Sequence, residues 1–406
     1  MTGRNRLASL PNAERLFILI GIAGSLLRIT FLITFPQIRG AEDLDIARHL
    51  AAGEGFSIYE RGPTTAKGPL YPIFLALFLR LGADPNHLWP AALVQHLLLA
   101  WTPFLLYRLG ATVASPFIGL LTGLAFAFHP SFFYYPNVLE NTSIFVFLSA
   151  CWGIGILKLR ERFSWGWAAF VGSWLGVSWI EKPAALLIMG IVLLGYIQRK
   201  ILLRLLPFAS FVILIWGLRG YLTFGYWTWT KTYAGQHTFA MSWHPRFAIS
   251  KEYAVSDSLA RQMDSLFLLP ERIGGPAFSA LGVKIAQQQG ILKLIKRTLL
   301  HAAIFWWIPP RYWNDNSLAF WLVRKLPVII INALFLLGLW YGLRKYRKLT
   351  LFILLTSILF TGVYAINHVL NIRYRLDIEW LQLYVCAMAI EGLGKSLGIS
   401  KLQNET

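Results

Sequence analysis

Apolar residues fall in long blocks along this chain, and short polar connections separate most of the blocks. A helix needs about 20 predominantly apolar residues to cross a bilayer. Ten segments approach that length: 16–36, 88–107, 111–129, 141–158, 165–181, 184–198, 202–222, 326–344, 349–367 and 378–394. The pattern therefore predicts an all-α polytopic membrane protein, with residues 1–406 forming a single membrane domain.

Two long segments interrupt the series of apolar blocks, at residues 37–87 and 223–325. The second segment contains short amphipathic stretches such as Ile291–Phe305, where leucine and isoleucine alternate with lysine. Stretches of this kind are expected to lie along a bilayer surface. We predict that both segments form large loops on one side of the membrane.

Charge supports the membrane assignment and indicates its orientation. Only 14% of the residues are charged, against about 25% in a soluble domain. The net charge of +19 is concentrated in short connections, namely Lys158, Arg160 and Arg162, then Arg199, Lys200 and Arg204, then Arg344, Lys345, Arg347 and Lys348. Because short basic connections mark the cytoplasmic side, we expect both termini inside and both large loops outside. This distribution argues against a nucleic-acid partner, which would require a basic stripe on a soluble domain.

The sequence gives no signal for a bound cofactor. The two cysteines lie inside apolar blocks, the histidines are scattered singly, and no glycine-rich phosphate loop or zinc signature occurs. We expect no obligatory metal, although a divalent ion bridging Asp43 and a substrate phosphate stays open as an alternative.

Two adjacent acids begin the first large loop. Glu42 and Asp43 precede the helically spaced residues Leu44, Ala47 and Leu50. A carboxylate at the membrane boundary can have a raised pKa and act as a general base. The competing interpretation is that both acids only stabilise the N-terminus of a short helix.

Three further segments carry candidate chemistry. Residues 62–72 form a turn rich in glycine and proline, either a plain interfacial loop or a support for substrate. Arg219 ends the seventh apolar block, where it either binds an anion or extends toward lipid headgroups. Arg373 and Arg375 flank Tyr374 just before the last block, and guanidinium groups match phosphate oxygens well.

These four segments, in this order, resemble the GT-C superfamily of membrane glycosyltransferases, with protein mannosyltransferases and lipid A aminoarabinose transferases as the nearer relatives. The first family stretch is matched by Ile46, Ala47, Leu50, Ala51, Gly53, Gly55, Phe56 and Ser57. The second is matched by Gly62, Pro63, Thr64, Ala66, Pro69, Tyr71 and Pro72. The last two are matched by Arg219, Tyr221, Phe224 and Gly225, and by Arg373, Tyr374 and Arg375. The chain departs from the family at Gly220, usually asparagine, and at Asp377, usually proline.

The resemblance implies a GT-C-like bundle of about ten transmembrane helices with two large periplasmic loops. It also implies a donor sugar linked to polyprenyl phosphate, an acceptor not identified by the sequence, and a location in the bacterial cytoplasmic membrane. On this basis Glu42 is the preferred catalytic acid, assisted by Asp43. The expected phosphate ligands are Arg219, Arg373, Arg375 and Lys182, and the residues expected to shape the site are Lys67, Tyr71, Tyr374 and Glu140.

Two other functions are compatible with the same pattern. A flippase for lipid-linked sugars would use a similar basic groove without a catalytic acid, but repeated halves, which are common in transporters, are not evident here. A ligase that joins lipid-linked glycans would share the fold, so likeness of fold alone does not separate it from a glycosyltransferase.

Overall fold

A computed structural model describes residues 11–308, 314–367 and 373–397. Nearly all regular structure in these ranges is helical, and every predicted span coincides with a helix. The corresponding helices are α1 (Pro11–Thr34), α4 (Trp89–Val113), α5 (Pro116–Ala127), α7 (Thr142–Glu161), α8 (Trp165–Glu181), α9 (Pro183–Tyr196), α10 (Arg199–Phe224), α16 (Leu326–Lys345), α17 (Arg347–Ile366) and α18 (Arg373–Ser396). The chain is thus an all-α polytopic membrane protein, as the sequence predicts.

The helices differ in how well each alone would cross a bilayer. Six helices of the described chain have the necessary length and hydropathy, and α5 forms a bent pair with α6 (Pro130–Tyr134) and η2 (Tyr135–Asn137). The bend of 53° falls at His129, just before Pro130. Helices α8 and α9 are shorter, with 17 and 14 residues. Helix α18 has charged residues in its first turns, so these need polar partners inside the bundle.

The remaining helices belong to the two large loops. Between α1 and α4 lie β1 (Arg39–Gly40), α2 (Glu42–Ala52), η1 (Tyr59–Arg61) and α3 (Leu70–Arg80). After α10 come α11 (Thr232–Met241), η3 (Lys251–Tyr253), α12 (Asp257–Phe267), α13 (Glu271–Gln289) and α14 (Ile291–Phe305). Then α15 (Leu318–Phe320) and η5 (Trp321–Lys325) continue directly into α16, so helical structure begins before the predicted start of that span at residue 326.

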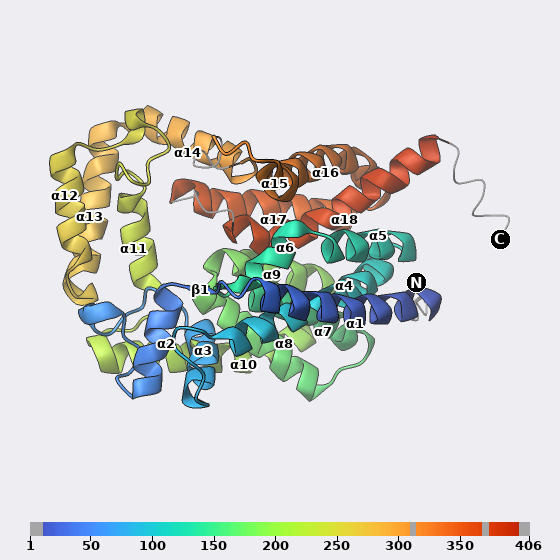
Figure 1. Cartoon of the computed structure of the whole chain (residues 1–406), viewed down its shortest axis with the longest axis horizontal. Coiled ribbons are helices and arrows are strands. Elements are labelled where there is room, and N and C mark those ends of the chain that lie inside the picture. The colour runs from blue at the N-terminus through green and yellow to red at the C-terminus, as the bar shows by residue number, and fades with distance from the viewer. Residues whose placement is uncertain (1–10, 309–313, 368–372, 398–406) are drawn as a thin grey trace.

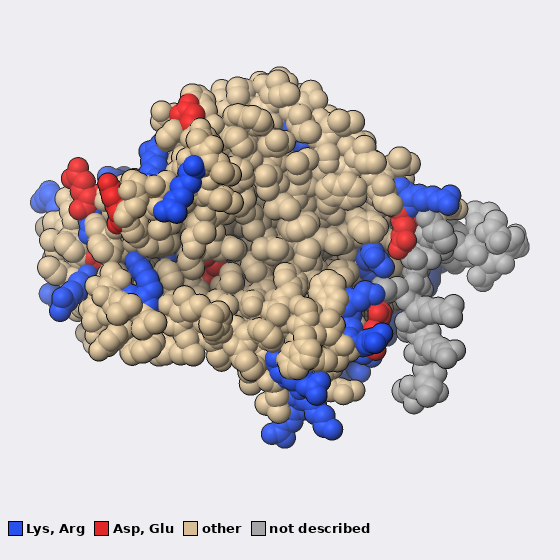
Figure 2. Space-filling model, turned by 90° about the horizontal axis from the view of Figure 1, so that it is seen from below, with Lys and Arg blue, Asp and Glu red and all other residues tan. Residues whose placement is uncertain are grey.

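The long helices run side by side along the longest axis, and the loop helices α2, α3 and α11–α13 gather at one end (Figure 1). The first turns of α1 and the last turns of α18 lie toward the opposite end. Figure 2 shows a central belt with few charged side chains, as expected for a lipid-facing surface. Basic side chains gather near the end with the termini, whereas acidic and basic side chains mix at the loop end. The orientation of these ends in the membrane stays a prediction. The basic residues Arg4 and Arg6, which precede the first apolar block, lie outside the described residues.

Small residues allow the bundle helices to approach closely. Gly110 on α4 faces Gly119 on α5, where a Cβ atom added to Gly110 would lie 2.6 Å from the Cα atom of Gly119. A Cβ atom at Gly119 would overlap the backbone around Tyr107, which cannot rotate away as a side chain could. Close backbone packing of this kind stabilises helix pairs in lipid, where no hydrophobic effect drives them together.

We expect Gly119→Ala to lower the free energy of unfolding by about 1–3 kcal/mol, because the new methyl group overpacks the α4–α5 contact. Gly362→Ala on α17 is the matched control, since a Cβ atom there meets no neighbour within 4 Å. Thermal unfolding in detergent, followed by circular dichroism, measures both variants. Equal melting temperatures for the two would contradict the close approach.

Candidate functional site

A polar cavity lies where the loop helices meet the bundle. Its empty volume is about 380 Å³. Its lining comes from residues of the two large loops, the start of α7, the α8–α9 junction, α17 and the first turns of α18. The lining residues are Asp43, Lys67, Gly68, Asn141, Thr142, Glu181, Lys182, Lys231, Tyr364, Arg373, Tyr374 and Asp377.

A short strand pair brings the first acidic motif to this cavity. Strand β1 pairs in parallel with β2 (Val138–Leu139), in a register that places Gly40 opposite Leu139. Asp43 follows the first strand and Asn141 follows the second, so both reach the same cavity. The N-cap of α2 is Ala41, and no side chain caps that helix end.

Glu42 and Asp43 share one lysine but differ in environment. The Nζ atom of Lys67 lies 2.7 Å from Oε2 of Glu42 and 3.7 Å from Oδ2 of Asp43. The attraction of Lys67 lowers the pKa of the partly exposed Glu42 to about 2. Burial raises the pKa of Asp43, although Lys67 and Arg373 act in the opposite direction. Burial alone would lower the pKa of Lys67, but the two carboxylates together raise it. Asp43 is therefore the better proton acceptor of the two.

The turn that carries Lys67 is fixed from outside the cavity. Oε2 of Glu271 on α13 accepts hydrogen bonds from Thr64 Oγ1 (2.8 Å) and Thr65 N (2.6 Å), and Thr65 Oγ1 donates to Oε1. Arg219 donates to the carbonyl oxygens of Thr64 (2.8 Å) and Phe56 (3.0 Å). Glu271 and Arg219 thus hold residues 62–69 between the second loop and α10.

We expect Glu271→Ala to accelerate amide hydrogen exchange at Thr65 and to lower the free energy of unfolding by about 1.5–3 kcal/mol, since hydrogen bonds to a charged group are lost. Glu252→Ala, at an exposed position of the same loop, is the control. Hydrogen–deuterium exchange read by mass spectrometry compares the two variants. Unchanged exchange at Thr65 in Glu271→Ala would refute the anchoring role.

Two adjacent residues of opposite charge, Glu181 and Lys182, lie at the α8–α9 junction. Oε1 of Glu181 accepts from the backbone N of Leu70 at 2.8 Å, and Oε2 accepts from Nδ2 of Asn141 at 3.1 Å. Gly68 packs directly on this carboxylate, and any Cβ atom there would overlap it. Lys182 forms an ion pair with Asp377 of α18. The junction is therefore tied to two other segments by hydrogen bonds and to α18 by an ion pair.

Helix α18 supplies a cation and part of an aromatic wall. Arg373 forms an ion pair with Glu140, and its Nη2 donates to the hydroxyl of Tyr374 at 3.1 Å. The Tyr374 ring stacks on Tyr364 with centroids 4.5 Å apart. Both rings line the cavity beside the guanidinium group. Glu140 touches the site through Arg373 and does not line the cavity itself.

Lys231 is a cavity cation that the sequence reading did not single out. It precedes α11, and no carboxylate of the described residues lies within 4.0 Å of its Nζ atom. Burial lowers the pKa of Lys231 to about 8; Glu181 opposes this shift, and Lys182 and Lys67 add to it. An unpaired ammonium in a polar cavity is well placed for an anionic ligand. The feature of the sequence that could have indicated Lys231 is its position directly after the aromatic-rich segment that follows the seventh span.

Three residues predicted for the site lie elsewhere. Arg219 is occupied by the two backbone carbonyls of the 62–69 turn. Arg375 is buried in the bundle, where its Nε and Nη2 atoms donate to Glu379 at 3.2 and 3.1 Å. Tyr71 is buried too, and its hydroxyl donates to Oε1 of Gln95 at 3.2 Å. Among the predicted residues, the cavity gathers Asp43, Lys67, Lys182, Arg373 and Tyr374, with Glu42 and Glu140 bonded to its rim.

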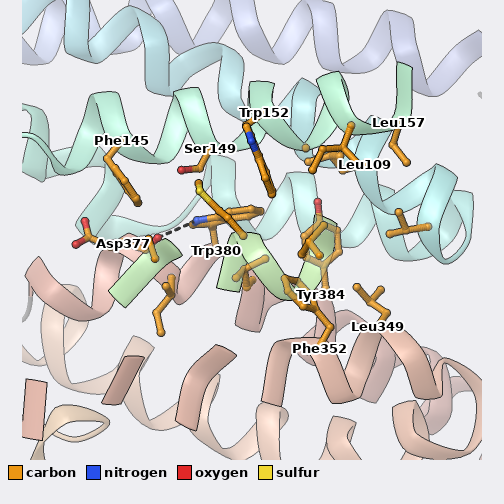
Figure 3. Close-up of a pocket in the computed structure, with 18 residues that line it drawn as sticks. Leu109, Phe145, Ser149, Trp152, Leu157, Leu349, Phe352, Asp377, Trp380 and Tyr384 are labelled. Carbon is orange, nitrogen blue, oxygen red and sulfur yellow. Dashed lines mark hydrogen bonds between the residues drawn. The ribbon is translucent and has the colours of Figure 1, made fainter. Parts of the chain in front are cut away.

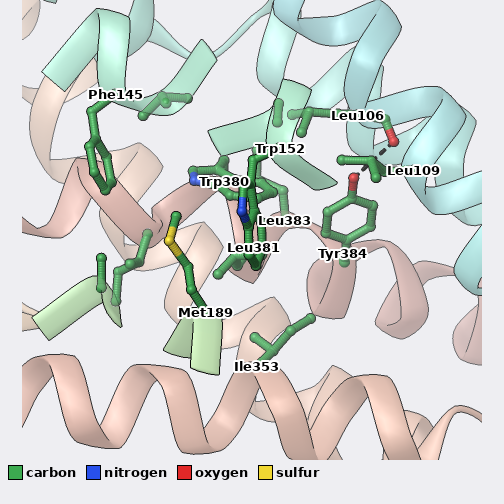
Figure 4. Packing of buried hydrophobic residues seen from close by; sticks show 14 of the residues in the cluster. Leu106, Leu109, Phe145, Trp152, Met189, Ile353, Trp380, Leu381, Leu383 and Tyr384 are labelled. Carbon is green, nitrogen blue, oxygen red and sulfur yellow. Dashed lines mark hydrogen bonds between the residues drawn. The ribbon is translucent and has the colours of Figure 1, made fainter. Parts of the chain in front are cut away.

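An apolar cavity of about 930 Å³ adjoins the polar one, and Asp377 lines both. Figure 3 shows Asp377 at one end of this cavity and Leu157 toward the other, with Trp152 and Trp380 between them. The indole of Trp380 donates to the backbone oxygen of Asp377 at 3.0 Å. Figure 4 shows the surrounding packing, in which Tyr384 donates to the backbone oxygen of Leu106 at 2.8 Å. The two cavities together suit a molecule with a charged head and a long apolar tail.

Fold and site thus define a polytopic membrane protein in which a charged cavity adjoins an apolar one. No protein-family model and no curated protein matches the chain. Among solved structures, the chain is similar to ArnT from Cupriavidus metallidurans bound to undecaprenyl phosphate. The identity is 14% and the TM-score 0.39, over 93% of this chain and 78% of that one.

Proposed function

We propose that this chain is a GT-C-type glycosyltransferase that transfers a sugar from a polyprenyl-phosphate donor to an acceptor on the outer face of the bacterial cytoplasmic membrane. The observation that carries the proposal is the junction of the two cavities at Asp377. One is lined by three buried acids and four cations, and the other is lined almost entirely by apolar side chains. The motif resemblance to this superfamily points to the same chemistry.

In this proposal the donor phosphate lies beside Lys231 and Arg373, in the cavity that Lys67 also lines. The prenyl tail occupies the apolar cavity toward Leu157. Lys182 contributes mainly by neutralising Asp377, because these two already form an ion pair. Cations fixed before the reaction stabilise charge that develops in the transition state without further reorganisation.

Asp43 acts as the general base. It removes the proton from an acceptor hydroxyl or amine as that atom attacks the anomeric carbon of the donor sugar. The bond between this carbon and the phosphate oxygen breaks, and the electron pair leaves with the polyprenyl phosphate. One displacement inverts the anomeric configuration. The raised pKa of Asp43, against the pKa of about 2 at Glu42, supports Asp43 rather than Glu42 in this role.

Product analysis tests the proposal. Purified protein in nanodiscs is supplied with labelled polyprenyl-phosphate sugars and a membrane extract as the source of acceptor. We expect labelled sugar to leave the lipid and free polyprenyl phosphate to accumulate, as followed by mass spectrometry. A lipid-linked sugar that changes leaflet with its glycosidic bond intact would indicate a flippase instead. Transfer of a whole glycan would indicate a ligase.

A further inference from the structure

Three aromatic rings form a stack at the outer end of α10. The rings of Tyr221 and Trp227 have centroids 5.7 Å apart and an interplanar angle of 26°. The rings of Trp227 and Trp229 are nearly parallel, with centroids 5.3 Å apart and an interplanar angle of 9°. The three side chains are 49%, 43% and 45% exposed in that order. We call these three residues the aromatic ladder.

The local sequence folds the chain back along α10 to build the ladder. Helix α10 ends at Phe224, and the capping residue Gly225, with a φ of +80°, reverses the chain direction at low cost. The returning segment then needs space on the helix surface. A Cβ atom at Gly217 would lie 2.8 Å from the Trp227 ring, and one at Gly220 would overlap Thr228. Gly220, where the resembling family usually has asparagine, thus accommodates the buried Thr228.

The ladder continues an exposed apolar surface of α10. The neighbouring positions Leu214, Ile215, Leu218 and Leu222 on α10 are all apolar and about half exposed or more. Tyrosine and tryptophan have an apolar body and a polar edge, and they concentrate where hydrocarbon meets headgroups. We propose that the aromatic ladder inserts at the outer headgroup interface of the bilayer and thereby positions Lys231 at the polar cavity.

The connection between the ladder and Lys231 is short and hydrogen-bonded. Thr230 follows Trp229 and precedes Lys231. Its Oγ1 donates to the backbone oxygen of Trp179 at 3.3 Å, and its own carbonyl accepts from Nε1 of Trp216 at 3.5 Å. Because only Thr230 separates Trp229 from Lys231, a shift of Trp229 should alter the position of Lys231 in the cavity. The part of the inference that concerns Lys231 rests on the proposed function, whereas the membrane contact does not.

Site-directed spin labelling tests the membrane contact. A nitroxide is attached at Trp227→Cys in a Cys151→Ala/Cys386→Ala background, in nanodiscs of phosphatidylcholine and phosphatidylglycerol. Leu218→Cys is the lipid-facing control and Glu252→Cys the aqueous control. We expect the label at position 227 to be more accessible to oxygen than to a nickel chelate. Its accessibility should resemble that of the label at position 218 rather than that at position 252. Accessibility equal to that at position 252 would overturn the inference and leave the ladder free for an aqueous partner such as an acceptor glycan.

A double-mutant cycle tests the link to Lys231. Binding of undecaprenyl phosphate is measured for Trp229→Ala, Lys231→Ala and the double variant. We expect Trp229→Ala to weaken binding on the order of tenfold, and to have no further effect once Lys231 is replaced. Trp229→Phe should restore binding because it retains an aromatic ring. Fully additive effects would refute the positioning role. If the unaltered protein did not bind this lipid, the proposed function would fail while the labelling result still decided the membrane contact.

Discussion

Asp43→Asn is expected to lower the rate of sugar transfer by about a hundredfold to ten-thousandfold, the usual contribution of a general base. Asparagine keeps the shape of the side chain but cannot take up the proton of the acceptor hydroxyl or amine. Donor binding should persist, because Lys231 and Arg373 are untouched. Single-turnover kinetics with labelled donor, at matched protein levels in nanodiscs, gives the rate of the chemical step.

Glu42→Gln is the informative comparison. Glu42 is partly exposed and tied to Lys67, so its loss should reduce transfer much less than the loss of Asp43. The raised pKa of Asp43 also predicts that transfer declines with acidification at a pH above the ordinary titration range of aspartate. A larger defect in Glu42→Gln than in Asp43→Asn would reverse the assignment of the base.

Lys231→Met should weaken binding of undecaprenyl phosphate by about 10- to 100-fold, corresponding to one charge-assisted hydrogen bond. Methionine is similar in length and apolar, so the wall of the cavity is retained while its cation is removed. The pKa of Lys231 is lowered to about 8, and only the protonated ammonium attracts phosphate. Affinity of the unaltered protein should therefore fall as pH rises through about 8, and the variant should lose this dependence. Isothermal titration calorimetry over a pH series measures both effects.

Lys251→Met provides the control for Lys231→Met, because Lys251 is exposed elsewhere in the same large loop. It changes net charge equally but removes no cavity cation. Should both variants bind the lipid with the same affinity and the same pH profile, Lys231 would not be a phosphate ligand.

The apolar pattern was sufficient to predict the bundle. Each of the ten blocks is a helix, because backbone groups in lipid must be bonded within the segment. The amphipathic stretch Ile291–Phe305 is a helix with the same bounds. Boundaries were less accurate where charges occur inside a helix. The last span was predicted to begin at residue 378, whereas α18 already begins at Arg373.

That earlier start explains why Arg373 and Arg375 separate. Two residues along an α-helix correspond to a rotation of about 200°. Arg373 therefore faces the cavity together with Asp377, one turn later, while Arg375 points into the bundle toward Glu379. With residues 373–377 predicted as part of a loop, both arginines were expected at one site. The four-residue spacing of Arg375 and Glu379 is typical of an ion pair within a helix and could have indicated that these two residues pair.

Other parts of the site depend on contacts between distant segments. Arg219 contacts Thr64, and Glu271 contacts Thr65, across more than 150 residues of sequence. The residue types at these positions are compatible with phosphate binding and with backbone anchoring alike. Only the folded arrangement separates Arg219, which holds a turn, from Lys231, which faces the cavity.

Cryo-electron microscopy of the protein in nanodiscs saturated with undecaprenyl phosphate tests the central claim most directly. We predict phosphate density between Lys231 and Arg373, with density for the prenyl chain passing Asp377 into the apolar cavity toward Leu157. Phosphate density at another place, such as Arg219 or the basic end near the termini, would contradict the account, as would an apolar cavity without lipid density at saturation.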